Sequence, residues 1–215
     1  MAVKELTQVG RCNRIGLDTR LASALDGTTA DWLVSRRAEV VRRPERLGEI
    51  FPAVARTVGR AGLGDGWTVD EAARASLVAA LAADQSPDDL ATALSGVYRY
   101  GDAAEKRAAL RALAVAEVAD RLGDRALPLL ADAIRTNDQR LLAAALGSYA
   151  TEHLDDAAFR QAVLKCVFTG VPLDLVDGLP DRADDELARM MADFAAERSA
   201  AGRDVPTDIR RYLEA

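Results

Sequence analysis

The residues of this chain whose types and positions could do chemistry are single charges set into otherwise apolar helical stretches. Arg74 is the only charge in residues 72–83, and Glu117 is the only charge in residues 112–119. Because a buried charge is costly unless it is paired, each of these side chains needs either a protein partner or a ligand.

Three further polar features lie within or between apolar segments. Lys165, one of only three lysines, lies in the segment AVLKCVFTG, and residues 135–138 (RTND) form a polar corner between two apolar stretches. Arg107 and Arg111 are four residues apart and share one face of a predicted helix. Like charges at this spacing destabilise a helix mildly unless an anion lies between them.

Two interpretations of these residues remain open. In the first, they form ion pairs and helix caps between neighbouring helices. In the second, several of them converge on a polar cavity, where the cations bind an anion and Glu117 or Asp138 could transfer protons. The candidate ligand-binding residues are Arg74, Arg107, Arg111, Glu117, Arg135, Asn137, Asp138 and Lys165.

Most familiar catalytic motifs are missing from the sequence. Neither the phosphate-binding pattern GxxxxGK[ST] nor a G-x-S-x-G nucleophile motif occurs, and GLGDG at 62–66 follows a helix rather than a strand. We therefore interpret 62–66 as a flexible linker. One histidine, His153, and two distant cysteines, Cys12 and Cys166, make a metal site improbable. We expect no metal and no cofactor, and the sequence leaves open whether the protein is an enzyme.

Charge and hydropathy bear on partners and compartment. The net charge is −6 and the sequence pI is about 5.0, whereas nucleic-acid binding usually leaves a basic footprint, so we expect no nucleic-acid partner. A local excess of arginine at residues 36–60 is interpreted mainly as solvated surface. The uncharged, largely apolar helical stretch at residues 75–83 is far shorter than the roughly 20 residues of a membrane span. We expect a cytoplasmic protein without a membrane span.

Helical periodicity and capping signals cover nearly the whole chain. Thr68 with Glu71 forms a capping box, Ser86 precedes a proline at the first helical position, and Gly170 follows a helix end. No window alternates with the period of a strand. The predicted helices cover residues 29–43, 44–59, 68–84, 87–100, 103–122, 124–136, 138–154, 156–169 and 183–201, with short ones at 21–25 and after Pro206.

This pattern predicts an all-α protein. It amounts to roughly five antiparallel helix pairs, forming either a degenerate helical repeat of the HEAT type or a compact α–α stack. Residues 72–83 and 108–119 are apolar on most faces, so we expect other helices to cover them on both sides. Residues 1–17 lack clear periodicity and are interpreted as an N-terminal arm, with a single domain at 18–215.

Several phrases of the sequence are similar to one known family. YRYGDAAEKRAALRAL (98–113), RTND (135–138), QAVLKCVFTGVPL (161–173) and GLPDRADDELARMMADFAAERSAAGR (178–203) resemble the EboA family, over about residues 18–213. The resemblance implies a setting in a secondary-metabolite pathway of the prenylated or cyclitol type. It implies no catalytic residues.

Two functions follow as hypotheses. The first is an accessory protein of such a pathway that acts as a helical binding or docking module, with another pathway protein or a small anionic or prenylated metabolite as its partner. The alternative is an enzyme or carrier that acts on a phosphorylated or prenyl-diphosphate intermediate in a polar cavity between helices.

Overall fold

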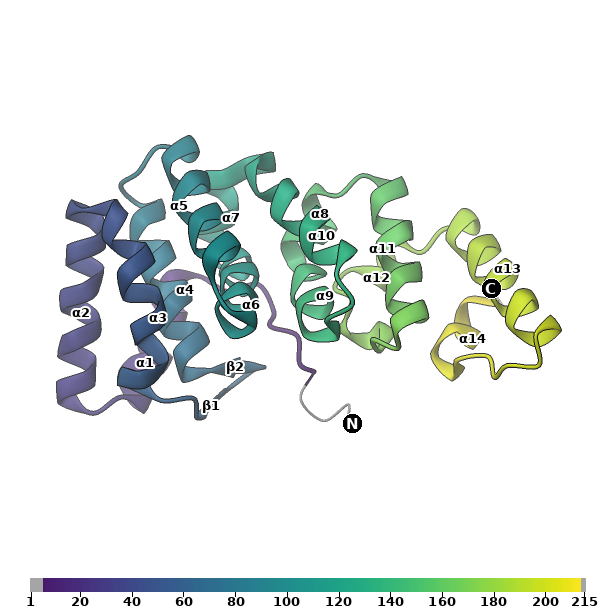
Figure 1. The fold of residues 1–215 in the computed structure, drawn as a ribbon, viewed down its shortest axis with the longest axis horizontal. Helices are drawn as coiled ribbons and strands as arrows, with labels where there is room; N and C mark the ends of the chain where they lie inside the picture. Colours follow the sequence, from purple (N-terminus) through teal and green to yellow (C-terminus); the bar gives the residue numbers. More distant parts are fainter. Residues whose placement is uncertain (1–5, 214–215) are drawn as a thin grey trace.

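A computed structural model describes residues 6–213, and within them the protein is built from helices apart from one small hairpin, which confirms the all-α prediction. The helices follow one another along an elongated molecule, with α1 to α7 at one end and α13 and α14 at the other (Figure 1). The first half contains α1 (Arg14–Ala24), α2 (Gly27–Arg42), η2 (Pro44–Arg46), α3 (Leu47–Val58), β1 (Gly62–Gly64), β2 (Trp67–Thr68), α4 (Val69–Ala82), α5 (Pro87–Tyr100), α6 (Ala103–Arg111) and η3 (Ala112–Ala114). The second half contains α7 (Ala116–Leu122), η4 (Gly123–Ala126), α8 (Leu127–Arg135), α9 (Gln139–Ala145), α10 (Ser148–His153), α11 (Asp156–Thr169), η5 (Leu173–Leu175), α12 (Leu179–Arg182), α13 (Asp185–Ala200), η6 (Thr207–Ile209) and α14 (Arg210–Leu213).

Helix α4 is the centre of the N-terminal half. All of its residues are buried, because α1, α2, α3, α6 and α7 pack around it. Its many alanines allow these neighbours to approach closely, and this confirms the prediction that residues 72–83 are covered on both sides. Burial on every face means that Asp70, Glu71 and Arg74, in its first two turns, must find partners inside the protein.

Capping signals in the sequence predicted the ends of helices α5 and α11 correctly. Helix α5 begins at Pro87 after Ser86, whose hydroxyl accepts the Asp89 N–H at 3.2 Å. Helix α11 begins after its N-cap Asp155 and ends at Gly170, whose φ of 77° is in the left-handed region that glycine adopts at little cost. Both helices have the predicted bounds.

The single helix predicted over residues 103–122 is wrong, because the N-terminal segment crosses it. The Cys12 N–H donates to the Ala114 carbonyl at 2.9 Å, and the Cys12 carbonyl accepts the Ala116 N–H at 2.8 Å. These bonds require an extended backbone at Val115 (φ −80°, ψ 118°), so α6 ends in η3 and α7 starts anew.

The helix predicted over residues 138–154 is also divided, into α9 and α10 around Leu146 and Gly147. The side chain of Gln8 lies near this break and donates through Nε2 to the carbonyls of Ala143 and Leu175, each at 2.9 Å. The N-terminal segment therefore occupies both helix breaks, and it is well packed, with Val9 only 2% exposed.

The prediction of a flexible linker at 62–66 is wrong as well. These residues enter an antiparallel hairpin of β1 and β2, in which Gly62 pairs with Thr68 and Gly64 with Trp67. Asp65 and Gly66 have φ values of 47° and 79°, as a type I′ hairpin turn requires. A Cβ at Gly66 would lie 2.2 Å from the Gln8 carbonyl oxygen, so the close approach of the N-terminal segment also requires glycine there.

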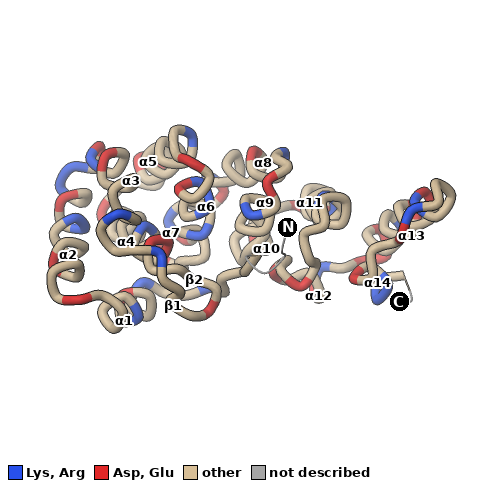
Figure 2. The backbone as a smooth tube through the Cα atoms, turned by 60° about the horizontal axis from the view of Figure 1, so that its bottom comes forward, with Lys and Arg blue, Asp and Glu red and all other residues tan. Residues whose placement is uncertain are grey.

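Charges are spread along most of the helices rather than collected on one face (Figure 2). The arginine-rich stretch at 36–60 is largely neutralised by neighbouring acids: Glu39 pairs with both Arg36 and Arg46, and Arg37 pairs with Asp18. Within residues 6–213, no helix combines the length and the apolar character needed to cross a bilayer.

Candidate functional site

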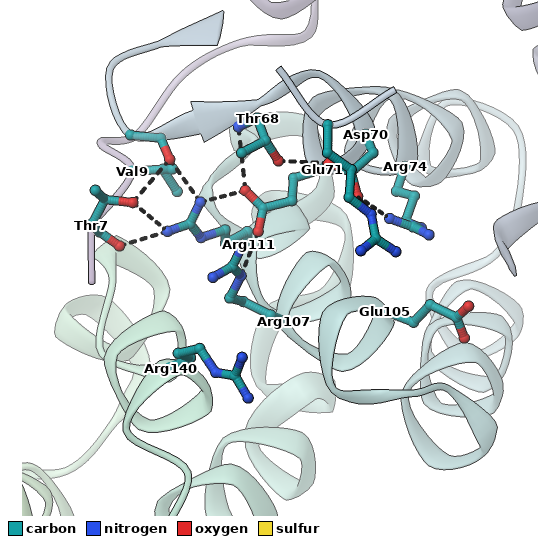
Figure 3. Close-up of polar contacts among 12 residues, drawn as sticks. Thr7, Val9, Thr68, Asp70, Glu71, Arg74, Glu105, Arg107, Arg111 and Arg140 are labelled. Carbon is teal, nitrogen blue, oxygen red and sulfur yellow. Dashed lines mark hydrogen bonds and ion pairs between the residues drawn. The ribbon is translucent and has the colours of Figure 1, made fainter. Parts of the chain in front are cut away.

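The candidate site is a cleft of about 540 Å³ where the N-terminal segment, the hairpin and the first turns of α4, α6 and α9 meet (Figure 3). We call it the arginine cleft, because four of its lining residues are arginines. It is lined by Thr7, Arg60, Gly62, Gly66, Trp67, Thr68, Asp70, Ala103, Ala104, Arg107, Arg111 and Arg140. Its volume lies within the range of small-molecule sites.

Arg107 and Arg111, predicted to need an anion between them, are bridged by the carboxylate of Glu71. Arg107 Nε donates to Glu71 Oε1 and Arg111 Nη1 donates to Glu71 Oε2, each at 2.5 Å. Glu71 Oε2 also accepts the Thr68 N–H at 3.3 Å as part of the capping box of α4. Figure 3 shows Glu71 between the two guanidinium groups. One buried carboxylate thus caps α4 and fixes two cations on α6.

Arg111 joins four segments of the chain. Besides Glu71, it donates to the Gly66 carbonyl at 2.7 Å and to the Thr7 carbonyl at 2.6 Å. Its side chain is 2% exposed, and burial lowers the pKa of its guanidinium from the usual value, although Glu71 opposes that effect. Its Nε is buried and has no hydrogen-bond partner in the described part of the chain. Arg111 therefore forms the rigid floor of the cleft.

A second ion pair lies beside the first. Arg74 Nη1 donates to Asp70 Oδ2 at 2.6 Å, and Arg74 Nε donates to the Phe51 carbonyl at 3.0 Å. The Thr68 hydroxyl donates to the other oxygen of Asp70 at 2.7 Å. Arg74 is 1% exposed, so it contributes to the positive potential near the cleft without being able to touch a ligand.

Two cations remain able to bind a ligand in the cleft. Arg107 uses only Nε for Glu71, and neither of its Nη atoms has a hydrogen-bond partner among residues 6–213. The side chain of Arg60 is 65% exposed. Within residues 6–213, its sole ion-pair contact is with Asp70, at 3.9 Å. Arg140, which lies beyond Arg107 in Figure 3, is held by Asp138 at 3.0 Å. The backbone of Ala103 and Ala104 adds the positive end of the α6 dipole.

The remaining predicted residues lie elsewhere. Glu117 is exposed and accepts the Arg14 N–H at the start of α1, at 3.0 Å. Lys165 Nζ donates to Asn137 Oδ1 at 2.8 Å, and Arg135 is 3.3 Å from Asp132; neither pair lies in the arginine cleft. Asp138 caps α9, and its hydrogen bond with Arg140 lowers its pKa. The structure thus brings together Arg74, Arg107 and Arg111, and it leaves Glu117, Arg135, Asn137 and Lys165 outside.

Sequence reasoning missed several residues of the cleft. Glu71 was identified only as a capping residue and Arg60 only as part of the arginine-rich stretch, and Thr7 and Arg140 were not singled out. The spacing of Asp70 and Arg74, four residues apart in a helix predicted to be buried, could have identified their ion pair. Nothing local could have shown that Thr7 meets Arg111, 104 residues further along.

The chemistry available at the cleft is electrostatic. Its lining offers guanidinium donors, the Thr68 and Thr7 hydroxyls and one carboxylate, Asp70. No group of three or more His, Cys, Asp or Glu residues within 6–213 could hold a metal ion. The arrangement suits recognition of a phosphate, diphosphate or carboxylate, because guanidinium groups match these anions in charge and geometry.

Fold and site together define an all-α protein with a cationic cleft built around buried ion pairs. A family model described as "Metabolite traffic protein EboA" matches residues 53–214. The chain therefore belongs to the EboA family, as the sequence phrases indicated. No curated protein and no solved structure matches it.

Proposed function

We propose that this protein is a binding protein for an anionic metabolite of a secondary-metabolite pathway, and that the arginine cleft is its binding site. The family description supports a role in metabolite handling. The observation that carries the proposal is the pair of Nη groups on Arg107 that have no partner among residues 6–213, on a guanidinium that Glu71 holds in a fixed orientation in the cleft. A guanidinium held in place by one anion is ready to bind a second anion without further loss of side-chain freedom.

The alternative of an enzyme acting on a phosphorylated or prenyl-diphosphate intermediate has less support. The carboxylate of Glu117 accepts the Arg14 N–H at the N-terminus of α1, and Asp138 is bound by Arg140, so the two proposed proton-transfer groups are occupied by helix capping. Asp70, the remaining acid of the cleft, is held by Arg74 and Thr68. A carrier needs only the cation, whereas an enzyme also needs a group that can exchange protons.

The test is thermal-shift screening with glucose 6-phosphate, geranyl diphosphate and inorganic diphosphate. A compound present at 100 times its dissociation constant should stabilise the protein by about 2.7 kcal/mol. Arg107→Gln should abolish the shift, whereas Arg56→Gln, an exposed arginine of α3 outside the cleft, should keep it. No shift with any of the anions, or an equal shift in the Arg107→Gln variant, would contradict the proposal.

A second proposal, that the protein docks on another protein of its pathway, is favoured by a different surface. Helices α8, α11 and α13 border a groove of about 650 Å³, in which Phe168 is 72% exposed beside Leu164 and Phe194. Arg135 and Lys165, predicted as site residues, lie on its rim. Exposed aromatic residues flanked by cations are common at protein interfaces.

Phe168→Ser tests this docking proposal, with Ile15→Ser as the matched control. Ile15 is 73% exposed on α1, far along the chain from the groove. Proteins encoded beside this chain should be retained on the wild type and on the Ile15→Ser variant, and lost from the Phe168→Ser variant. Equal retention by all three would exclude the groove as the docking surface.

A further inference from the structure

Another cavity, between α3 and α5, differs chemically from the arginine cleft. We call it the α3–α5 groove; its volume is about 670 Å³. The buried side chains of Leu47, Phe51 and Val97 line it. It is lined in full by Pro44, Glu45, Leu47, Gly48, Phe51, Pro52, Gln85, Asp89, Thr92, Ala93, Gly96, Val97, Tyr100, Gly101 and Glu105. Among residues 6–213, this lining includes three acids and no Lys or Arg.

Two positions in opposite walls of the groove are glycine although neighbouring atoms leave room for a side chain. Gly48 lies in α3 and Gly96 in α5, and a Cβ built on either would meet no atom within 4 Å. By contrast, a Cβ at Gly101 would lie 2.5 Å from the Val97 carbonyl oxygen. Glycine within a helix weakens it relative to alanine. The space that Gly48 and Gly96 leave open is therefore a feature of the groove itself.

Pro52 leaves the backbone carbonyl of Gly48, in the same wall, without its helical hydrogen-bond donor. It lies inside α3 and has no N–H, so it cannot form the helical hydrogen bond to the carbonyl of Gly48, four residues earlier. Gly48 is exposed and lacks a side chain that would cover its carbonyl. Gly48 therefore lines the groove and has a backbone carbonyl without the usual helical donor four residues later.

The acids of the groove are unequally neutralised. Glu45 pairs with Arg43 at 3.2 Å. Asp89 accepts a hydrogen bond from the Ser86 hydroxyl, and Glu105 accepts one from the Asp102 N–H, both of which are neutral donors. Arg99 lies over the Tyr100 ring at 5.7 Å and does not line the groove. Asp89 and Glu105 thus bring two negative charges to the lining, and neither forms an ion pair within residues 6–213.

We propose that the α3–α5 groove binds a small hydrophobic molecule that carries one positive charge, such as an aromatic amine. The apolar lining takes the hydrophobic body, whose burial is the main driving force. Asp89 and Glu105 attract the cation, and the Gly48 carbonyl accepts a hydrogen bond from it. Tyr100, 84% exposed at the rim, offers a ring face for the same cation or for an aromatic ring. The site is separate from the arginine cleft and does not depend on the function proposed for it.

The experiment uses three probes that share a naphthylmethyl body and carry a positive, a neutral and a negative head group: 1-naphthylmethylammonium, 1-naphthylmethanol and 1-naphthylacetate. Isothermal titration calorimetry on the full chain should give the tightest binding for the ammonium, weaker binding for the alcohol by roughly two- to fivefold, and none for the acetate in this groove. Glu105→Gln keeps the capping hydrogen bond but removes the charge, so it should reduce the preference for the ammonium over the alcohol.

Gly96→Leu fills the groove and should abolish binding of the ammonium and alcohol probes there. Its melting temperature should be equal to or above that of the wild type, because the new side chain meets open space and favours the helix. Gly27→Leu, at the first residue of α2 and outside the groove, is the matched control and should bind normally. Binding that survives Gly96→Leu, or equal affinity for ammonium and acetate, would overturn the proposal. Acetate binding that is lost in Arg107→Gln would instead report on the arginine cleft.

Discussion

Arg111 donates through Nη2 to both the carbonyl and the hydroxyl oxygen of Thr7, at 2.6 and 2.8 Å, although 104 residues separate them in the chain. The same guanidinium holds the hairpin through Gly66 and α4 through Glu71. The floor of the arginine cleft and the attachment of the N-terminal segment therefore depend on one side chain. Substitutions of Arg111 should therefore affect both the stability of the protein and binding in the arginine cleft, and the two effects must be measured separately.

Arg111→Met is expected to destabilise the protein by about 3–5 kcal/mol, because it leaves the buried carboxylate of Glu71 with a single cation. Urea denaturation monitored by circular dichroism measures this. The control is Arg111→Met combined with Glu71→Gln, which removes the buried charge and should recover part of the loss. A double variant as unstable as the sum of both single variants would show that the pair is not energetically coupled.

Gln8→Ala is expected to cost about 1–3 kcal/mol, since two carbonyls, of Ala143 and Leu175, lose their shared donor. Hydrogen exchange should rise in α9, next to the break at Leu146. Gln161→Ala, an exposed glutamine of α11, serves as the control and should change neither quantity. Unchanged exchange in α9 would show that Gln8 does not stabilise the divided helix.

How far the sequence predicts this structure depends on the range of each interaction. Helix α11 is defined by Asp155 and Gly170, a few residues from its ends, and its bounds were correct. The break between α6 and α7 depends on Cys12, about a hundred residues away, and no local pattern contains it. The hairpin turn at Asp65 and Gly66 was predictable from its Asp-Gly pair but was interpreted as a linker.

The candidate site shows the same division. The i, i+4 spacing of Arg107 and Arg111 correctly indicated a shared anion, but the anion is Glu71, on a helix more than thirty residues earlier. The pattern of isolated charges in apolar helices identified residues that need partners. It could not identify which helices would bring those partners. Lys165 consequently meets Asn137 and not the arginines.

Cys166 is expected to resist alkylation in the native protein. Burial raises the pKa of its thiol to about 12, so the reactive thiolate is scarce at pH 8. Burial also raises the pKa of Cys12, which is partly buried. Intact-mass analysis after iodoacetamide treatment at pH 8 should show little labelling of the native protein and two labels in guanidinium chloride. Because the folded-state pKa of Cys166 is raised, its contribution to stability should decline between about pH 9 and pH 12.

Asp184 links α11 to α13 and should make that link sensitive to acid. It caps α13 by accepting the Leu187 N–H at 2.9 Å and pairs with Arg160, and these contacts lower its pKa from 3.8 to about 2. A depressed folded-state pKa means that the stabilisation is complete above about pH 4 and is lost as the pH falls toward 2.

Asp184→Asn keeps a good N-cap residue but removes the charge. The difference in unfolding free energy between wild type and variant should therefore be constant from pH 7 to about pH 4 and shrink toward zero near pH 2. Urea denaturation at each pH measures it, with Asp185→Asn as the control, because Asp185 is the next residue along and has no ion pair among the described residues. A difference that persists unchanged at pH 2 would show that the carboxylate of Asp184 acts only as a hydrogen-bonding cap, and that its charge contributes nothing to holding α13 against α11.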